Sequence, residues 1–134
     1  MASIQREILM DAAPEQVWDA ARDIGALHTR LVPGFVVDTQ VEEGARIVSF
    51  ANGMVVRELI IDVDDAKRRI AWAAVGTAMT HYNASFQVLE EAGRARGVWI
   101  ADLLPNEAAP AIAMMIDQGL QAMKLAMEAH HPEG

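Results

Sequence analysis

Apolar and polar positions alternate at the start of the chain, and helical periodicity follows directly. Residues 4–10 alternate in this way, which predicts a strand with one face inward. Pro14 suits a first helical position, and the apolar stripe after it predicts a short helix from 14 to about 23. Gly25 ends this helix, and a second short helical piece is expected over 26–31.

Turn residues at regular intervals then divide residues 35–103 into six antiparallel strands. The breaks fall at Glu42-Glu43-Gly44, Asn52-Gly53, Asp64-Asp65-Ala66-Lys67, Gly76 to Thr80 and Glu91-Ala92-Gly93-Arg94. The Asn-Gly dipeptide predicts a two-residue type I′ turn, because both central positions of that turn need a positive φ. Such a turn pairs Ala51 with Met54, and therefore Ile47 with Glu58.

A long amphipathic helix is predicted to close the fold. Pro105 opens it, and we expect it to last to about Glu128. Its apolar positions recur at intervals of three and four residues: Ile112, Ile116, Leu120, Met123 and Met127. We therefore expect one domain over residues 1–129 and a C-terminal tail over 130–134, which contains His130 and His131.

This order of elements predicts an α+β protein. We expect a curved seven-stranded antiparallel sheet wrapped around the long C-terminal helix, with two short helices after the first strand. A curved sheet that grips one helix leaves a cavity between them. The sequence therefore predicts a ligand cavity but does not identify the ligand.

Five motifs occur in an order that resembles a known superfamily. They are Ala13-Pro14 with Val17-Trp18, Arg57-Glu58-Leu59, residues 64–72, His81-Tyr82-Asn83-Ala84, and Asp102-Leu103-Leu104-Pro105. Together they span nearly the whole chain and resemble the helix-grip fold of the Bet v 1-like or START-like (SRPBCC) superfamily. This superfamily includes polyketide cyclase/dehydrase-like proteins. The resemblance implies a hydrophobic ligand cavity.

Composition narrows the possible partners. The chain of 134 residues has a formal net charge of −8, which opposes binding to a nucleic-acid backbone. It has no cysteine, which excludes disulfides and thiolate metal sites and fits a reducing compartment. No secretory signal and no apolar stretch of 18 or more residues is recognisable. We expect a cytoplasmic monomer or homodimer without a membrane span.

The direction of Glu58 decides the chemistry of the expected cavity. Periodicity alone favours an outward Glu58, because more apolar residues share the opposite face with Arg57. A four-residue loop at 64–67 leaves Trp72 on that opposite face, whereas an odd-length loop or a bulge places it beside Glu58. In ligand-binding members of the superfamily, residues matching Glu58, Trp72 and Tyr82 line the cavity. The resemblance therefore favours the inward register, which we adopt.

The predicted site joins apolar walls with a few polar anchors. A buried Glu58 is a polar anchor or a general acid/base, and the alternative is a solvated glutamate beside Arg57. The Tyr82 hydroxyl is a candidate donor, and His81 and His28 are candidate proton shuttles. The predicted ligand-binding residues are His28, Glu58, Ile60, Trp72, Tyr82, Ala84, Phe86, Asp102, Met115 and Gly119.

Three functional classes fit these residues. The leading hypothesis is binding of a small apolar or amphipathic molecule between the sheet and the C-terminal helix. The alternative is a cofactor-independent enzyme resembling polyketide cyclases or dehydratases, with Glu58, Tyr82 or His81 moving protons. A protein-interaction module is the third class. No metal is expected, because the histidines and carboxylates lack a recognised ligand spacing.

Overall fold

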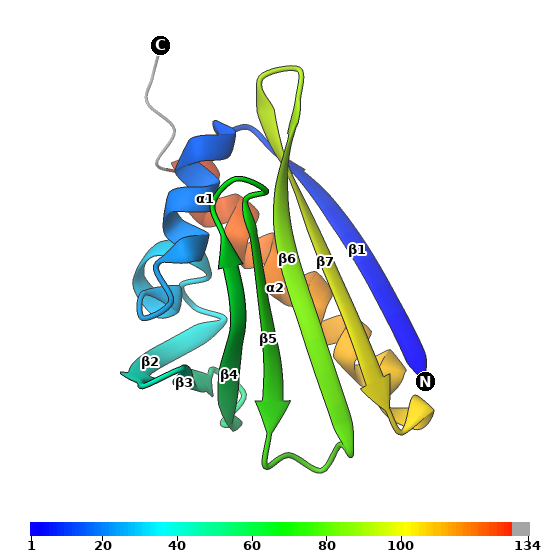
Figure 1. Ribbon diagram of the computed structural model, residues 1–134. Coiled ribbons are helices and arrows are strands. Elements are labelled where there is room, and N and C mark those ends of the chain that lie inside the picture. Colours follow the sequence, from blue (N-terminus) through cyan, green and yellow to red (C-terminus); the bar gives the residue numbers. More distant parts are fainter. Residues whose placement is uncertain (130–134) are drawn as a thin grey trace.

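The computed structural model describes residues 1–129, so the predicted tail at 130–134 lies outside the described residues. One sheet and one long helix dominate the fold (Figure 1). The elements are β1 (Ala2–Met10), α1 (Pro14–Arg22), the π-helical turn η1 (Leu27–Leu31), β2 (Val36–Glu42), β3 (Ala45–Phe50), β4 (Val55–Asp64), β5 (Arg69–Val75), β6 (His81–Glu91), β7 (Arg94–Leu104), the 3₁₀ turn η2 (Asn106–Ala108) and α2 (Ala109–Ala129).

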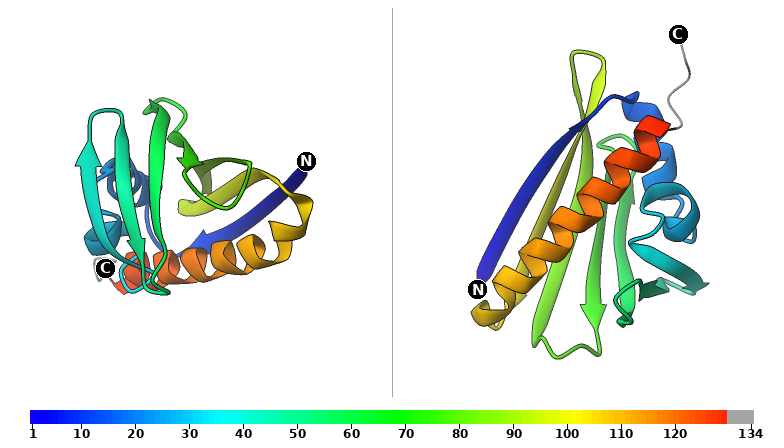
Figure 2. Two further views of the ribbon diagram at one scale, coloured as in Figure 1. Left: turned by 90° about the horizontal axis from the view of Figure 1, so that it is seen from below. Right: turned by 180° about the vertical axis from the view of Figure 1, so that it is seen from behind.

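The sheet has seven antiparallel strands in the order β1-β7-β6-β5-β4-β3-β2. Figure 2 shows that it curves around α2, which crosses its concave side, while α1 and η1 lie beside the end of α2 that is nearer the C-terminus. The predicted α+β helix-grip architecture is therefore confirmed. Its core lies between the sheet and α2, where Leu103, Ile116 and Met123 are fully buried.

The predicted two-residue turn at Asn52-Gly53 is wrong. Phe50 N donates to Met54 O at 2.8 Å, so the loop contains three residues, and only Gly53 of the dipeptide has a positive φ, at 92°. A type I turn followed by a left-handed glycine is the usual three-residue hairpin loop. It shifts the register by one residue, so that Arg46 and not Ile47 pairs with Glu58.

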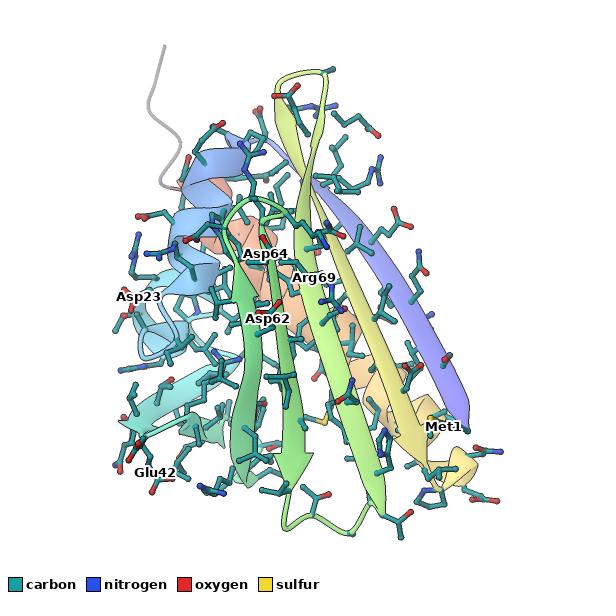
Figure 3. The ribbon with its side chains drawn as sticks, in the orientation of Figure 1. Met1, Asp23, Glu42, Asp62, Asp64 and Arg69 are labelled. Carbon is teal, nitrogen blue, oxygen red and sulfur yellow. The ribbon has the colours of Figure 1, made fainter. Side chains whose placement is uncertain are left out.

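A bulge in β4 sets which side chains enter the cavity. Ile60 pairs with Trp72 and Asp62 with Ala71, which leaves Ile61 as the extra residue, and its side chain is exposed. Because the extra residue reverses the alternation, Ile60 and Trp72 share the inner face while Asp62 turns outward. Figure 3 shows the outer face of the sheet, where Asp62 lies near other charged side chains.

Side-chain contacts tie α1 to the loop between β4 and β5. Trp18 Nε1 donates to Asp65 Oδ1 at 3.0 Å, and Arg22 Nε forms an ion pair with the same oxygen at 2.8 Å. The body of Trp18 is buried against the core while its N–H reaches the loop. These contacts hold α1, and with it η1, against the open side of the sheet.

Candidate ligand-binding cavity

A cavity of about 90 Å³ lies between the sheet, η1 and α2. Strands β2 to β7 all contribute to its wall, because their inward-facing side chains converge where the sheet curves. Most of that wall is apolar, and the apolar side chains include Leu27, Leu31, Val36, Val48, Val56, Ile70, Ile112, Ile116 and Met123. The predicted cavity thus exists, and it is small and mainly hydrophobic.

Five of the ten residues predicted to contact a ligand line this cavity. They are Glu58, Trp72, Tyr82, Phe86 and Met115. Alternation along β5 and β6 brings the three aromatic rings inward, while Met115 comes from the opposite wall on α2. The sequence pattern and the family resemblance together therefore locate part of the aromatic wall of the cavity.

Arg46 and Glu58 form a buried ion pair in the cavity wall. Arg46 Nε lies 2.9 Å from Glu58 Oε1, and only 3% and 9% of the two side chains is exposed. Arg46 Nη1 also donates to the carbonyl oxygen of Ile24 at 3.4 Å, and its guanidinium carbon lies 5.5 Å from the centre of the Trp72 ring. Hydrogen bonding and cation–π contact therefore hold the guanidinium in one place.

The surroundings of Glu58 act on its charge in opposite directions. Burial raises the pKa of its carboxyl, because the charged form loses its hydration, and the charge and hydrogen bond of Arg46 limit that rise. A guanidinium keeps its proton at any physiological pH, and a buried cation without a counter-charge is costly. We therefore describe the pair as ionised near neutral pH, with no net charge.

Tyr82 and Trp99 form the second polar element of the wall. Burial, followed by the negative charge of Glu58, raises the pKa of Tyr82, so its hydroxyl stays neutral and able to donate. The Trp99 N–H opposes part of this rise, although its geometry falls short of a hydrogen bond. Trp99 Nε1 is consequently a buried polar atom without a partner in the described part of the chain.

Two predicted contacts lie outside the cavity because of strand direction or local bonding. Asp102 pairs with Asn83 on the outer face of the sheet and accepts a hydrogen bond from the Ser3 hydroxyl. His28 is held at the edge strand, where its Nδ1 lies 3.2 Å from Thr39 Oγ1. His81, the first residue of β6, is exposed and does not line the cavity either.

The other three predicted contacts do not line the cavity but lie next to residues that do. Ile60 and Ala84 are the two neighbours of Trp72 across the sheet. Gly119 lies against two aromatic rings, and a Cβ there would come within 3.0 Å of Trp99 Cζ3 and 3.1 Å of Phe35 Cε2. Its lack of a side chain therefore allows close packing of α2 on these rings.

The most important residue that sequence reasoning missed is Arg46. The two-residue turn placed Ile47 opposite Glu58, and Arg46 was not among the predicted site residues. A three-residue loop at the same Asn-Gly dipeptide would have identified the pair, because the register then matches an acid with a base. Phe35, Phe50 and Trp99 also line the cavity and were not predicted.

Three methionines line the cavity at the end where its loops meet. Met54 precedes β4, Met79 lies in the loop between β5 and β6, and Met115 lies in the half of α2 nearer its N-terminus. Figure 1 shows both loops at the same end of the sheet. Because thioether side chains are flexible, this end is the part of the wall that adapts most readily.

Within residues 1–129, no group of three or more metal-ligating side chains comes together. The helices in this range are also too short or too polar to cross a membrane. The lining residues with polar side-chain groups are Arg46, Glu58, Thr77, Tyr82 and Trp99. The Thr77 hydroxyl already bonds to the backbone of Met79 within its own loop.

A long helix gripped by a curved seven-stranded sheet, with an internal hydrophobic cavity, defines the Bet v 1-like helix-grip class. The chain belongs to the polyketide cyclase/dehydrase and lipid transport family, whose model matches residues 1–128. No curated protein matches the sequence.

Solved structures with the same fold cover almost the whole chain. The protein XoxI from Bacillus cereus is similar with a TM-score of 0.84 and 21% identity, covering 95% of this chain and 96% of that one. An uncharacterized protein from Bacillus thuringiensis is similar with a TM-score of 0.84 and 19% identity, covering 94% of this chain and 98% of that one. Ara h 8.0201 is similar with a TM-score of 0.76 and 13% identity, covering 96% of this chain and 99% of that one. At these identities the likeness establishes the fold.

Proposed function

We propose that this protein binds a small, mostly apolar ligand in the cavity between the sheet and α2. The observation that supports this most is a hydrophobic cavity with a buried polar cluster in its wall, formed by Arg46, Glu58 and Tyr82. Ligand sites typically combine apolar walls with a few polar groups that orient the bound molecule. Membership of a family that includes lipid-transport proteins supports the same function.

The volume of the cavity limits the size of the ligand. About 90 Å³ is less than the roughly 300–1,000 Å³ of common ligand pockets and less than the roughly 150 Å³ cavity that accommodates benzene. A ligand of one ring or more must therefore displace part of the wall. The three methionines Met54, Met79 and Met115 are the side chains best suited to move.

Two experiments test this function. Native mass spectrometry of protein purified from its own source should show a retained small molecule. Ala74→Phe should abolish binding of this molecule, because Ala74 lines the cavity beside Glu58 and a ring there fills the space. The matched control is Ala73→Phe, since Ala73 is the preceding residue on the opposite face of β5. A chain that stays empty, or equal binding by both variants, would contradict the proposal.

The burial of Glu58 also supports a second candidate function, a cofactor-independent cyclase or dehydratase. A carboxyl with a raised pKa near a neutral phenol is suited to proton transfer, whereas the exposed His81 is not placed to contribute. The ion pair with Arg46 favours binding over catalysis, because it engages one oxygen of the proposed base. Conversion of the retained molecule by the protein, abolished in both Glu58→Gln and Tyr82→Phe, would identify an enzyme.

A further inference from the structure

The polar groups of the cavity keep unused hydrogen-bonding capacity. Glu58 accepts from Arg46 through Oε1, and its Oε2 has no partner among residues 1–129. Within the same range, the Tyr82 hydroxyl donates to no other group, and Arg46 uses Nε and Nη1 but not Nη2. The wall therefore offers one strong acceptor next to donors.

The charges beside these free groups cancel. The guanidinium of Arg46 is 2.9 Å from the carboxylate of Glu58, and both side chains are almost completely buried. No other charged side chain among the described residues lines the cavity. A ligand that enters thus meets a polar wall with no net charge to neutralise.

We propose that the cavity selects uncharged ligands that carry a hydrogen-bond donor beside an acceptor, and that it rejects carboxylates of the same shape. A primary amide or a similar group fulfils this requirement, because it donates to Glu58 and accepts from Tyr82 or Arg46. This selectivity rests on the proposed function of ligand binding. It extends that function by naming the chemistry of the ligand's polar end.

A carboxylate fails in this site for two physical reasons. It has no proton to donate to Glu58, so two anions would face each other across a medium of low dielectric constant. Its own desolvation would also go uncompensated, because Glu58 already matches the charge of Arg46. An aromatic hydrocarbon avoids both costs but leaves the free polar groups of the wall unpaired.

Three probes of similar size separate these cases: benzamide, benzoate and toluene. Their dissociation constants are measured on the unmodified protein at pH 7 by NMR titration. Benzamide should bind about ten to a hundred times more tightly than benzoate, as expected when hydrogen bonds to charged groups are gained or lost. Toluene should bind with intermediate affinity. Equal binding of benzamide and benzoate would overturn the inference while leaving the proposed function intact.

Glu58→Gln provides a sharper version of the test, because it leaves the charge of Arg46 unmatched. This variant should reverse the preference, so that benzoate binds more tightly than benzamide. Glu42→Gln is the control: it removes the same charge from the exposed ion pair with Arg57, and the preference should not change. A folded Glu58→Gln protein that still prefers benzamide would contradict the inference. Failure of all three probes to bind the unmodified protein would contradict the proposed function as well.

Discussion

Replacing the two members of the buried ion pair, singly and together, tests how the cavity wall is held. Glu58→Leu leaves the Arg46 guanidinium buried without a counter-charge, and Arg46→Met leaves the Glu58 carboxylate buried without one. Breaking a buried pair in this way costs about 3–5 kcal/mol. A domain of this size is usually stable by about 5–15 kcal/mol, so either single change removes a large part of the total.

The magnitude for each variant follows from the contacts that it loses. Arg46→Met also removes the hydrogen bond to the Ile24 carbonyl and the contact with the Trp72 ring, each of which contributes about 1 kcal/mol. The double variant Arg46→Met/Glu58→Leu removes both charges and fills the space with apolar atoms. It should be close to the unmodified protein or more stable, since such replacements are often neutral or stabilising.

Arg46→Met should also be sensitive to pH. Burial raises the pKa of Glu58, and without Arg46 nothing among the described groups limits that rise. A carboxyl whose pKa is raised by folding contributes to stability at a pH below its pKa in the unfolded chain. This contribution is lost as the pH rises through its pKa in the folded protein. The variant should therefore lose more stability at pH 8 than at pH 5. Glu58→Leu has no carboxyl at this position and should show no such trend.

Urea denaturation followed by tryptophan fluorescence measures these free energies, because the chain has three tryptophans and two of them line the cavity. The two single losses should together exceed the loss in the double variant by about 3 kcal/mol or more. If the single losses simply add up to the loss in the double variant, the ion pair is not coupled. The reasoning about the cavity wall would then be wrong.

Three further predictions concern single residues. Tyr82 is the one tyrosine of the chain, so absorbance at alkaline pH reports its ionisation, and the midpoint in the folded protein should lie well above pH 10.0. Because the pKa of Tyr82 is raised in the folded state, its contribution to stability is present below pH 10.0 and declines above it. A folded midpoint near 10.0 would contradict its burial. Gly119→Ala should lower the free energy of unfolding, measured by urea denaturation, by about 1 kcal/mol, because overpacking against Trp99 outweighs the gain in helix propensity. A more stable variant would show that the Trp99 ring moves aside. Trp18→Phe should cost about 1–2 kcal/mol through its lost bond to Asp65, with Asp62→Asn as a control that should change little.

The element order could be predicted from sequence because each element has a period of its own. The inward position of Tyr82 on β6 follows from counting alternate residues, whereas for Trp72 on β5 counting left both faces open and the resemblance favoured the inward one. The apolar spacing of α2 similarly identifies its buried stripe, which includes Ile116 and Met123. These patterns are local, and each one is long enough to exclude the other type of element.

The polar part of the site could not be predicted in the same way, because it depends on two irregularities. The Asn52-Gly53 dipeptide fits both a two-residue and a three-residue loop, and these differ by one residue in register. The bulge at Ile61 has no distinct sequence signal, since its neighbours are ordinary strand residues. The loop determines which residue faces Glu58, and the bulge determines whether Trp72 lies beside it.

Stability alone does not explain why this cavity contains a charged pair. Apolar residues of similar volume would stabilise the wall at least as well, because the desolvation of two buried charges offsets most of the free energy of their attraction. The pair does supply a donor and an acceptor inside a hydrophobic space without a net charge. A wall built for recognition needs such groups, whereas a wall built only for packing does not. The position of Arg46 and Glu58 in the cavity therefore favours a role in distinguishing ligands by their polar ends.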